Sequence, residues 1–258
     1  MTLTYGSYLK LDELLALQQP VSPGPEHDET LFIVIHQVYE LWFKQILHEL
    51  GHLQAALEAG EEAVAQAGFK RILTILKVLV SQIDVLETMT PVSFQAFRHR
   101  LDTASGFQSL QFREVEHVLG RRKPGMLAHY GEEGRERLER LRLRPSLYDS
   151  FLRYLAGRGY PVPPAVLERD PSGPPPEDPE VREILLQIYH RDPPVREVCE
   201  RMVDLDEGIQ EWRYRHVKMV ERTIGTRRGT GGSAGAEYLR TTLTPPLFPD
   251  LWAIRARL

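Results

Sequence analysis

The chain has 258 residues and a formal net charge of -4 at pH 7, which argues against nucleic acid or an anionic membrane surface as its main partner. No apolar run reaches the roughly 18 residues of a membrane span, and the N-terminal MTLTYGSYLK lacks the order of a secretory signal, so we expect a soluble, cytoplasmic protein. Cys199 is the single cysteine, which excludes an internal disulfide, a cysteine-rich zinc site and covalently attached haem.

Helical periodicity dominates the chain and strand-like alternation is hard to find, so we predict an all-α fold. The first long helix is predicted over residues 29–57, with Asp28 as its N-cap and Gly60 just past its end. Because the stretch from Leu31 to Phe43 is apolar almost all round, we expect this helix in the centre of a helical bundle.

His36 lies in the middle of this apolar stretch, LFIVIHQVYELWF. An unpaired buried polar group costs on the order of 1–3 kcal/mol. The imidazole must therefore be hydrogen-bonded, bound to a metal or turned towards a cavity.

Further helices follow in chain order. A second long helix is predicted over residues 61–89 and ends before Pro91, because the residue ahead of a proline avoids the helical conformation. Shorter helices are predicted over residues 94–101, 109–120 and 145–159.

Eight prolines fall within residues 160–180, a density that is typical of a linker. We interpret residues 158–180 as an excursion within a single domain that spans residues 1–258. The reason is that the residues expected to form one site, such as His36 and His216, lie on both sides of this stretch.

The last long helix is the most regular. Its apolar positions recur three and four residues apart, as in a seam that packs into a bundle, and His216 occupies one of these positions. The seam consists of Val195, Val198, Met202, Leu205, Ile209, Trp212, His216, Met219 and Thr223.

His36 and His216 thus both lie on helix surfaces that are predicted to face the bundle. For either residue alone, a core histidine hydrogen-bonded to a neighbour is the simpler interpretation. Together, and without cysteine ligands, they favour an iron or haem pocket, because imidazole is the commonest axial ligand that proteins supply. The pattern does not tell which of the two binds iron.

Residues 48–52, HELGH, match the H-E-x-x-H pattern of zinc hydrolases, in which two imidazoles one helical turn apart bind the metal. Gly51 loosens the helix inside this motif, and no second histidine motif follows at the usual spacing. On a helical wheel His48 lies about 120° from His36, so the two serve different surfaces. A zinc hydrolase that uses His48, Glu49 and His52 is the alternative to a haem site.

Residues 224–235, IGTRRGTGGSAG, suggest a phosphate-binding loop, but the pattern fails in detail. Such a loop needs a lysine after its second glycine and lies between a strand and a helix, whereas this segment follows a helix. We interpret it as a flexible loop that can close over a small anionic or zwitterionic ligand.

Arg98 lies among aromatic residues, close to Phe94 and Phe97. It is either a surface residue whose aliphatic part packs on the protein, or a guanidinium group that binds a carboxylate through two hydrogen bonds in an aromatic pocket. Ser105 and Gly106 follow and indicate a turn at which the backbone approaches a ligand.

Several long motifs occur in one order along the chain: YGSYLKLDELLALQ, HDETLFIVIHQVYELWFKQILHEL, VLETMTPVSFQAFR, ASGFQSLQFR and WRYRHVKMVERTIGTRRGTGGSAGAEYL. They resemble the haem-dependent tryptophan 2,3-dioxygenase family over about residues 5–119 and 205–252, whereas residues 120–200 resemble it loosely. The resemblance implies an all-helical homotetramer, a dimer of dimers, that binds haem b non-covalently. It also implies the conversion of L-tryptophan and O2 into N-formyl-L-kynurenine, the first step of tryptophan catabolism by the kynurenine pathway.

The resemblance also assigns roles to single residues. It implies that His216 is the proximal iron ligand and that His36 is the distal histidine that meets the indole N–H. Arg98 matches the residue that pairs with the substrate carboxylate, and Thr230 the residue that contacts the ammonium and carboxylate ends. The other substrate-binding positions are Phe32, Phe94, Leu101 and Ser105 in the pocket, and Tyr5, Tyr8 and Leu9 in an N-terminal segment that completes a neighbouring subunit's pocket.

Phe94 departs from the family pattern, because some members carry tyrosine there. The aromatic wall is kept and any hydrogen bond of the hydroxyl is lost. Besides the zinc hydrolase, a haem-binding sensor without turnover is an alternative; it would keep His216 but would not need Arg98 and Thr230 together.

Overall fold

A computed structural model gives the fold and describes residues 2–24, 26–122, 127, 130–227, 229 and 235–258. These residues form helices joined by turns and loops and contain no β-strand, so the prediction of an all-α fold is confirmed. Among the described helices, none carries an apolar stretch long enough to cross a bilayer.

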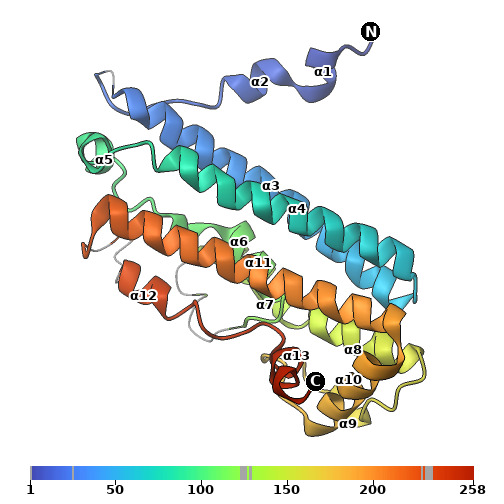
Figure 1. Cartoon of the computed structure of the whole chain (residues 1–258). Helices are drawn as coiled ribbons and strands as arrows, with labels where there is room; N and C mark the ends of the chain where they lie inside the picture. Colours follow the sequence, from blue (N-terminus) through green and yellow to red (C-terminus); the bar gives the residue numbers. More distant parts are fainter. Residues whose placement is uncertain (1, 25, 123–126, 128–129, 228, 230–234) are drawn as a thin grey trace.

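The long helices α3 (His27–Glu58), α4 (Glu62–Leu86) and α11 (Pro193–Ile224) run side by side along the molecule (Figure 1). Helix α4 packs against both of the others, whereas α3 and α11 contact each other much less. The shorter helices α6 (Leu110–Val118) and α8 (Leu147–Gly157) pack along α3. This arrangement leaves room for a cavity between α3 and α11.

The remaining helices are short and lie around these. They are α1 (Tyr5–Leu9), α2 (Leu11–Leu15), α5 (Pro91–Arg98), α7 (Glu132–Arg142), α9 (Pro164–Leu167), α10 (Pro179–Arg191), α12 (Ala236–Arg240) and α13 (Pro249–Ala253), with 3-10 turns at Gly106–Gln108 and Arg255–Arg257.

Local signals explain where the helices around the cavity begin. The Asp192 side chain accepts a hydrogen bond from the backbone N–H of Val195 (3.2 Å) at the start of α11. Thr90 accepts one from Ser93 (3.1 Å) ahead of α5, whose first residue is Pro91. The chain thereby leaves α4 and re-enters a helix within a few residues, and α5 packs against both α3 and α11.

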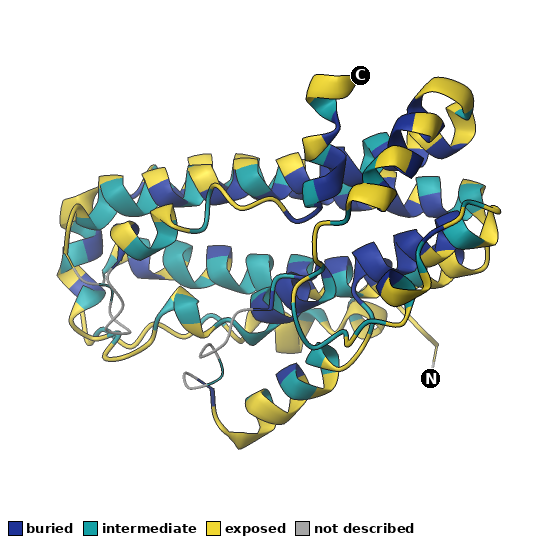
Figure 2. Cartoon of the chain, turned by 90° about the horizontal axis from the view of Figure 1, so that it is seen from below, coloured by how far each residue is buried: buried dark blue, intermediate teal, exposed yellow. Residues whose placement is uncertain are grey.

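Helix α3 is less enclosed than its sequence suggested. Figure 2 shows buried positions on the inner sides of the long helices and exposed positions on their outer sides. On α3, Val34 and Leu41 are 37% and 51% exposed, and His48, Gly51 and His52 also face outwards. The expectation that this helix is surrounded is therefore wrong for one side, because α4, α6 and α8 cover only the others.

The proline-rich excursion is packed against the bundle. Arg169 donates two hydrogen bonds to the carboxylate of Asp149 on α8, at 2.8 and 2.9 Å. The buried Arg122 donates to the backbone carbonyl groups of Arg142, Arg144 and Pro171. These bonds fix the excursion to α8 and, through Arg122, to the end of α7.

The C-terminal segment is fastened to α11 by Asp206, which is fully buried. Its carboxylate accepts hydrogen bonds from the backbone N–H groups of Leu247 (2.8 Å) and Phe248 (3.2 Å) and from the indole N–H of Trp252 (2.9 Å). One carboxylate thus satisfies three donors that would otherwise be buried without partners.

Candidate active site

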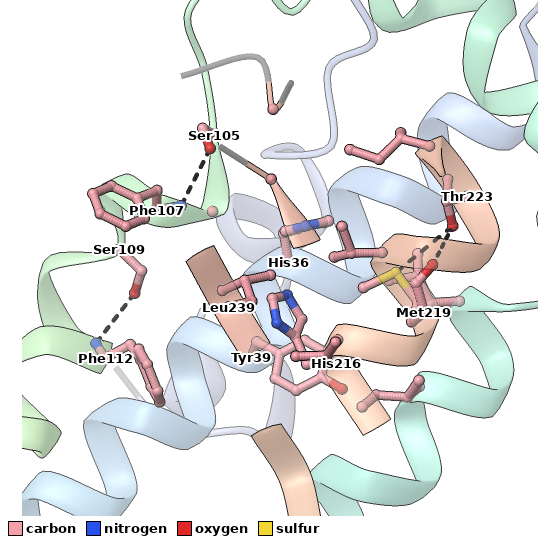
Figure 3. A pocket seen from close by; sticks show the side chains of 18 of the residues that line it. His36, Tyr39, Ser105, Phe107, Ser109, Phe112, His216, Met219, Thr223 and Leu239 are labelled. Atoms are coloured by element: carbon pink, nitrogen blue, oxygen red, sulfur yellow. Dashed lines mark hydrogen bonds between the residues drawn. The ribbon is translucent and has the colours of Figure 1, made fainter. Parts of the chain in front are cut away.

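A cavity with a volume of about 270 Å³ lies among α3, α4, α5, α6 and α11 (Figure 3). Its walls are mainly apolar and come from segments that are far apart in the sequence. They include Phe32, Tyr39, Phe43, Ile83, Leu86, Phe94, Phe112, Trp212 and Met219. An apolar cavity with a few well-placed polar groups is the usual form of a small-molecule site.

His36 faces this cavity from α3. Its Nδ1 lies 2.7 Å from the carbonyl oxygen of Phe32, one helical turn earlier. A carbonyl oxygen can only accept, so Nδ1 carries the proton and Nε2 can accept a hydrogen bond from a ligand. Burial lowers the pKa of His36, although the bond to Phe32 and the charge of Glu40 oppose this, so the ring is uncharged at neutral pH.

His216 reaches the same cavity from α11. Burial, assisted by the nearby His36, lowers the pKa of His216 to about 4. The imidazole is therefore uncharged at neutral pH and has a lone pair for a metal ion. The structure thus brings together the two histidines that the sequence singled out.

The segment from α5 to the following 3-10 turn closes one side of the cavity. Phe94, Arg98, Leu101 and Ser105 all line it. The Phe94 ring is buried and lies 5.8 Å from the ring of Phe32, measured between centroids. Arg98 is half-buried and contributes to the wall, which disfavours its interpretation as a plain surface residue.

A buried charged cluster forms one polar part of the wall, and the sequence did not indicate it. The Glu116 carboxylate accepts hydrogen bonds from Arg113 and Arg213, and all three residues line the cavity. Two guanidinium groups against one carboxylate leave an excess of positive charge. In addition, Nε of Arg113 is buried without a hydrogen-bond partner in the described part of the chain. The position of Arg213 one turn before His216 was the only signal in the sequence.

The glycine-rich loop adjoins the cavity. Gly229 and Gly235 contribute to its lining, whereas Thr230 lies outside the described residues. Gly235 has a φ of 62°, and a Cβ atom there would lie 2.7 Å from the carbonyl oxygen of Arg227. Only glycine suits this position.

The predicted N-terminal residues do not line the cavity of their own chain. Tyr5, Tyr8 and Leu9 lie on α1 and are 76%, 70% and 41% exposed. Figure 1 shows α1 and α2 at the edge of the molecule, and none of their residues is buried.

The HELGH motif does not form a metal site. Glu49 is buried and accepts hydrogen bonds from Arg71 (3.0 Å) and Gln45 (2.7 Å), so its carboxylate is already used. His48 and His52 point outwards from α3. Within the described ranges, no group of three or more potential metal ligands occurs. The zinc hydrolase is therefore not favoured.

Sequence comparison gives an independent finding. The profile of the family described as tryptophan 2,3-dioxygenase matches residues 1–142 and 181–258. The tryptophan 2,3-dioxygenase of Herpetosiphon aurantiacus is 60% identical over 257 residues, which cover 99% of this chain and 98% of that protein. The protein of the same name from Anaeromyxobacter sp. is 62% identical over 258 residues, which cover 99% and 96%, respectively. The one from Kineococcus radiotolerans is 45% identical over 262 residues, which cover 99% and 91%.

Proposed function

Because the chain belongs to the tryptophan 2,3-dioxygenase family and is thus a dioxygenase, we propose that its cavity binds haem b and L-tryptophan together. The reaction inserts both atoms of O2 across the indole C2=C3 bond and gives N-formyl-L-kynurenine. The observation that carries the proposal is the convergence of His36 and His216, both uncharged, on one apolar cavity.

The residues present suit a haem group. Apolar and aromatic walls match the flat macrocycle, and the uncharged imidazole of His216 is a suitable axial ligand. Arg113 and Arg213 together carry one more positive charge than Glu116 neutralises, and the Nε–H group of Arg113 has no hydrogen-bond partner among the described residues. Both features suit the carboxylates of the haem propionates. When bound, the haem iron supplies the binding and activation of O2.

The side chains around the cavity orient the substrate. The guanidinium of Arg98 pairs with the substrate carboxylate, and Thr230 contacts the amino-acid end of the molecule. Phe32, Phe94 and Leu101 enclose the indole ring, with Ser105 at the turn beside it. Because both the amino-acid end and the indole end of the substrate are held, the bound molecule stays in a geometry that can react.

His36 accepts a hydrogen bond from the indole N–H. Its unprotonated Nε2 supports this assignment, because the proton of the ring is held on Nδ1 by the carbonyl oxygen of Phe32. His36 orients the indole without serving as an obligatory base, since both oxygen atoms can be inserted while the indole keeps its proton.

The active assembly is a homotetramer in which the N-terminal segment of one subunit completes the pocket of another. The exposed Tyr5, Tyr8 and Leu9 support this proposal, since apolar side chains on an isolated arm need a partner. The base of the arm is anchored: the buried carboxylate of Glu29 accepts hydrogen bonds from the backbone N–H groups of Val21 (2.7 Å) and Ser22 (3.2 Å).

Residues 1–258 form one domain in this proposal. The packing of the excursion through Arg122 and Arg169 supports it, as does the position of cavity residues before and after that segment.

An absorption spectrum of the purified protein tests the function. A Soret band and the formation of N-formyl-L-kynurenine from L-tryptophan and O2 are expected. A Soret band without turnover would indicate the haem-binding sensor, and a protein without a haem band that is activated by zinc would indicate the hydrolase.

A further inference from the structure

The imidazole of His216 is held differently from those of other histidines in the neighbouring helices. In His36 and His117, Nδ1 donates to the carbonyl oxygen four residues earlier, that of Phe32 at 2.7 Å and that of Arg113 at 2.9 Å. His216 forms no hydrogen bond with any of the described residues. Its ring must therefore be held by a different kind of contact.

That contact is a stacked tryptophan. Trp212 precedes His216 by one helical turn on α11, so both side chains lie on the same face. The ring centroids are 5.3 Å apart and the ring planes are inclined by only 9°. Nearly parallel rings at this distance restrict the rotation of the imidazole about its own side-chain bonds.

Trp212 is itself fixed by rings from two other helices. It is 7% exposed. Phe112 on α6 lies 4.8 Å from it, and Phe43 and Tyr39 on α3 lie at 6.0 and 6.3 Å, measured between centroids. The Tyr39 hydroxyl donates to the carbonyl oxygen of Leu79 on α4 at 2.7 Å, which ties this cluster to a third helix. The indole cannot turn unless several of these groups move.

We propose that Trp212 is a positioning residue for the proximal ligand: the plane of its indole sets the plane of the His216 imidazole and keeps that ring aimed into the cavity. Metal-binding histidines usually obtain their orientation from a hydrogen bond between the second ring nitrogen and a carboxylate, a carbonyl oxygen or water. Stacking supplies the orientation without a protein acceptor, so it does not raise the basicity of the imidazole. The inference rests on His216 being the iron ligand, as proposed above.

The test compares the holoenzymes of Trp212→Leu, Trp212→Phe and Trp252→Leu with the unmodified protein. Leucine removes the stacking surface, whereas phenylalanine keeps a ring. Trp252 is the matched control, because it is a partly buried tryptophan that donates to Asp206 and does not line the cavity. The measurements are the rate of haem loss to excess apomyoglobin and the iron–histidine stretching band in resonance Raman spectra of the ferrous protein.

Trp212→Leu should lose haem roughly 10–100-fold faster, because replacing a residue that orients a metal ligand typically lowers the affinity by this factor and a lower affinity is expressed mainly as faster dissociation. Its iron–histidine band should shift or broaden, because the imidazole can rotate. Trp212→Phe should restore most of both properties. Trp252→Leu should lower the melting temperature and leave the band unchanged.

Wild-type haem retention and an unchanged band in Trp212→Leu would overturn the inference. If that variant does not fold, Phe112→Leu takes its place, because it removes one of the rings that hold Trp212. An unchanged band in Phe112→Leu would overturn the inference equally. His216→Ala separates the ligand role of His216 from the positioning role of Trp212. If His216→Ala retains haem, His216 is not the iron ligand. If His216→Ala loses haem while the iron–histidine band of Trp212→Leu is unchanged, only the role of Trp212 is refuted.

Discussion

His36 on α3 and His216 on α11 line the same cavity, and burial lowers the pKa of both imidazoles. Each ring is therefore uncharged at neutral pH and offers a nitrogen lone pair. In the proposed site the lone pair of His216 binds iron and that of His36 accepts a hydrogen bond. Substituting one histidine at a time therefore tests the two roles separately.

His216→Ala should lose the proposed haem, because it removes the proposed iron ligand. The purified variant should lack the Soret band, whereas His48→Ala should keep both the band and the turnover of L-tryptophan, since His48 is exposed on a different face of α3. Absorption spectra and turnover rates of the two proteins check this. An inactive His48→Ala protein with full haem content would restore HELGH as a candidate catalytic motif.

Arg98→Lys should lower kcat/KM for L-tryptophan by about one to two orders of magnitude. Lysine keeps the charge but loses the fork that makes two parallel hydrogen bonds, each worth roughly 1.5–3 kcal/mol. Tryptamine lacks the carboxylate and should be a poor substrate for the unmodified enzyme, and the variant should discriminate little between the two compounds. Wild-type kinetics of Arg98→Lys on L-tryptophan would remove Arg98 from the site.

Tyr8→Ala and Arg98→Ala should complement each other in mixed oligomers. Each variant alone should bind tryptophan poorly, one because it supplies a defective arm and the other because its own pocket is defective. After co-expression, an Arg98→Ala subunit can supply an intact arm to the intact pocket of a Tyr8→Ala subunit, so turnover should exceed that of either variant.

In the control, a chain that carries both Tyr8→Ala and Arg98→Ala is co-expressed with the Tyr8→Ala chain. No intact arm is then present, and turnover should stay low. If the Tyr8→Ala and Arg98→Ala mixture also fails to recover, the arm does not complete a neighbour's pocket.

Acid should destabilise the haem-free protein through His216. Its pKa falls from 6.5 in the unfolded chain to about 4 in the folded protein, so below pH 6.5 the unfolded chain takes up a proton that the folded one does not. Stability therefore decreases as the pH falls from 6.5 towards 4, where the folded protein also binds the proton. The melting temperature of the haem-free protein should fall more between about pH 7 and about pH 5 than that of His216→Phe. Equal decreases would show that burial does not perturb this imidazole.

Asp206→Ala should lower the free energy of unfolding by at least about 3 kcal/mol. It leaves the N–H groups of Leu247, Phe248 and Trp252 without their acceptor, and each unsatisfied buried donor costs about 1–3 kcal/mol. Asp204→Ala is the matched control: its side chain is 39% exposed and pairs with Arg201, so the loss should stay below about 1 kcal/mol. Denaturant titration of both variants measures the difference.

The long helices could be predicted from the sequence because their periodicity is sustained. Residues 29–57 were expected where the structure has His27–Glu58, and residues 61–89 where it has Glu62–Leu86. The five-residue helices α1 and α2 escaped prediction, since so short a segment does not complete a repeating pattern. Capping by Thr4, whose side chain accepts from Ser7, is visible only in the structure.

The candidate site could be predicted in part. His36 and His216 stood out because each interrupts an apolar pattern, and a polar residue in such a place needs a reason. Arg113, Glu116 and Arg213 did not stand out, because charged residues on a helix usually face water. Their burial depends on how α6 and α11 approach each other, which no local pattern encodes.

The α1–α2 arm buries none of its residues within its own subunit. Helices of this length are not stable alone in water, so in the proposed tetramer their order would depend on a neighbouring subunit and hence on mass action. In the proposed tetramer, dilution below the dissociation constant of the subunits would weaken tryptophan binding, because the arms leave the pockets. Haem retention would not change, since His216, Arg113 and Arg213 all come from one chain. Substrate affinity would then vary with enzyme concentration while cofactor affinity stays constant.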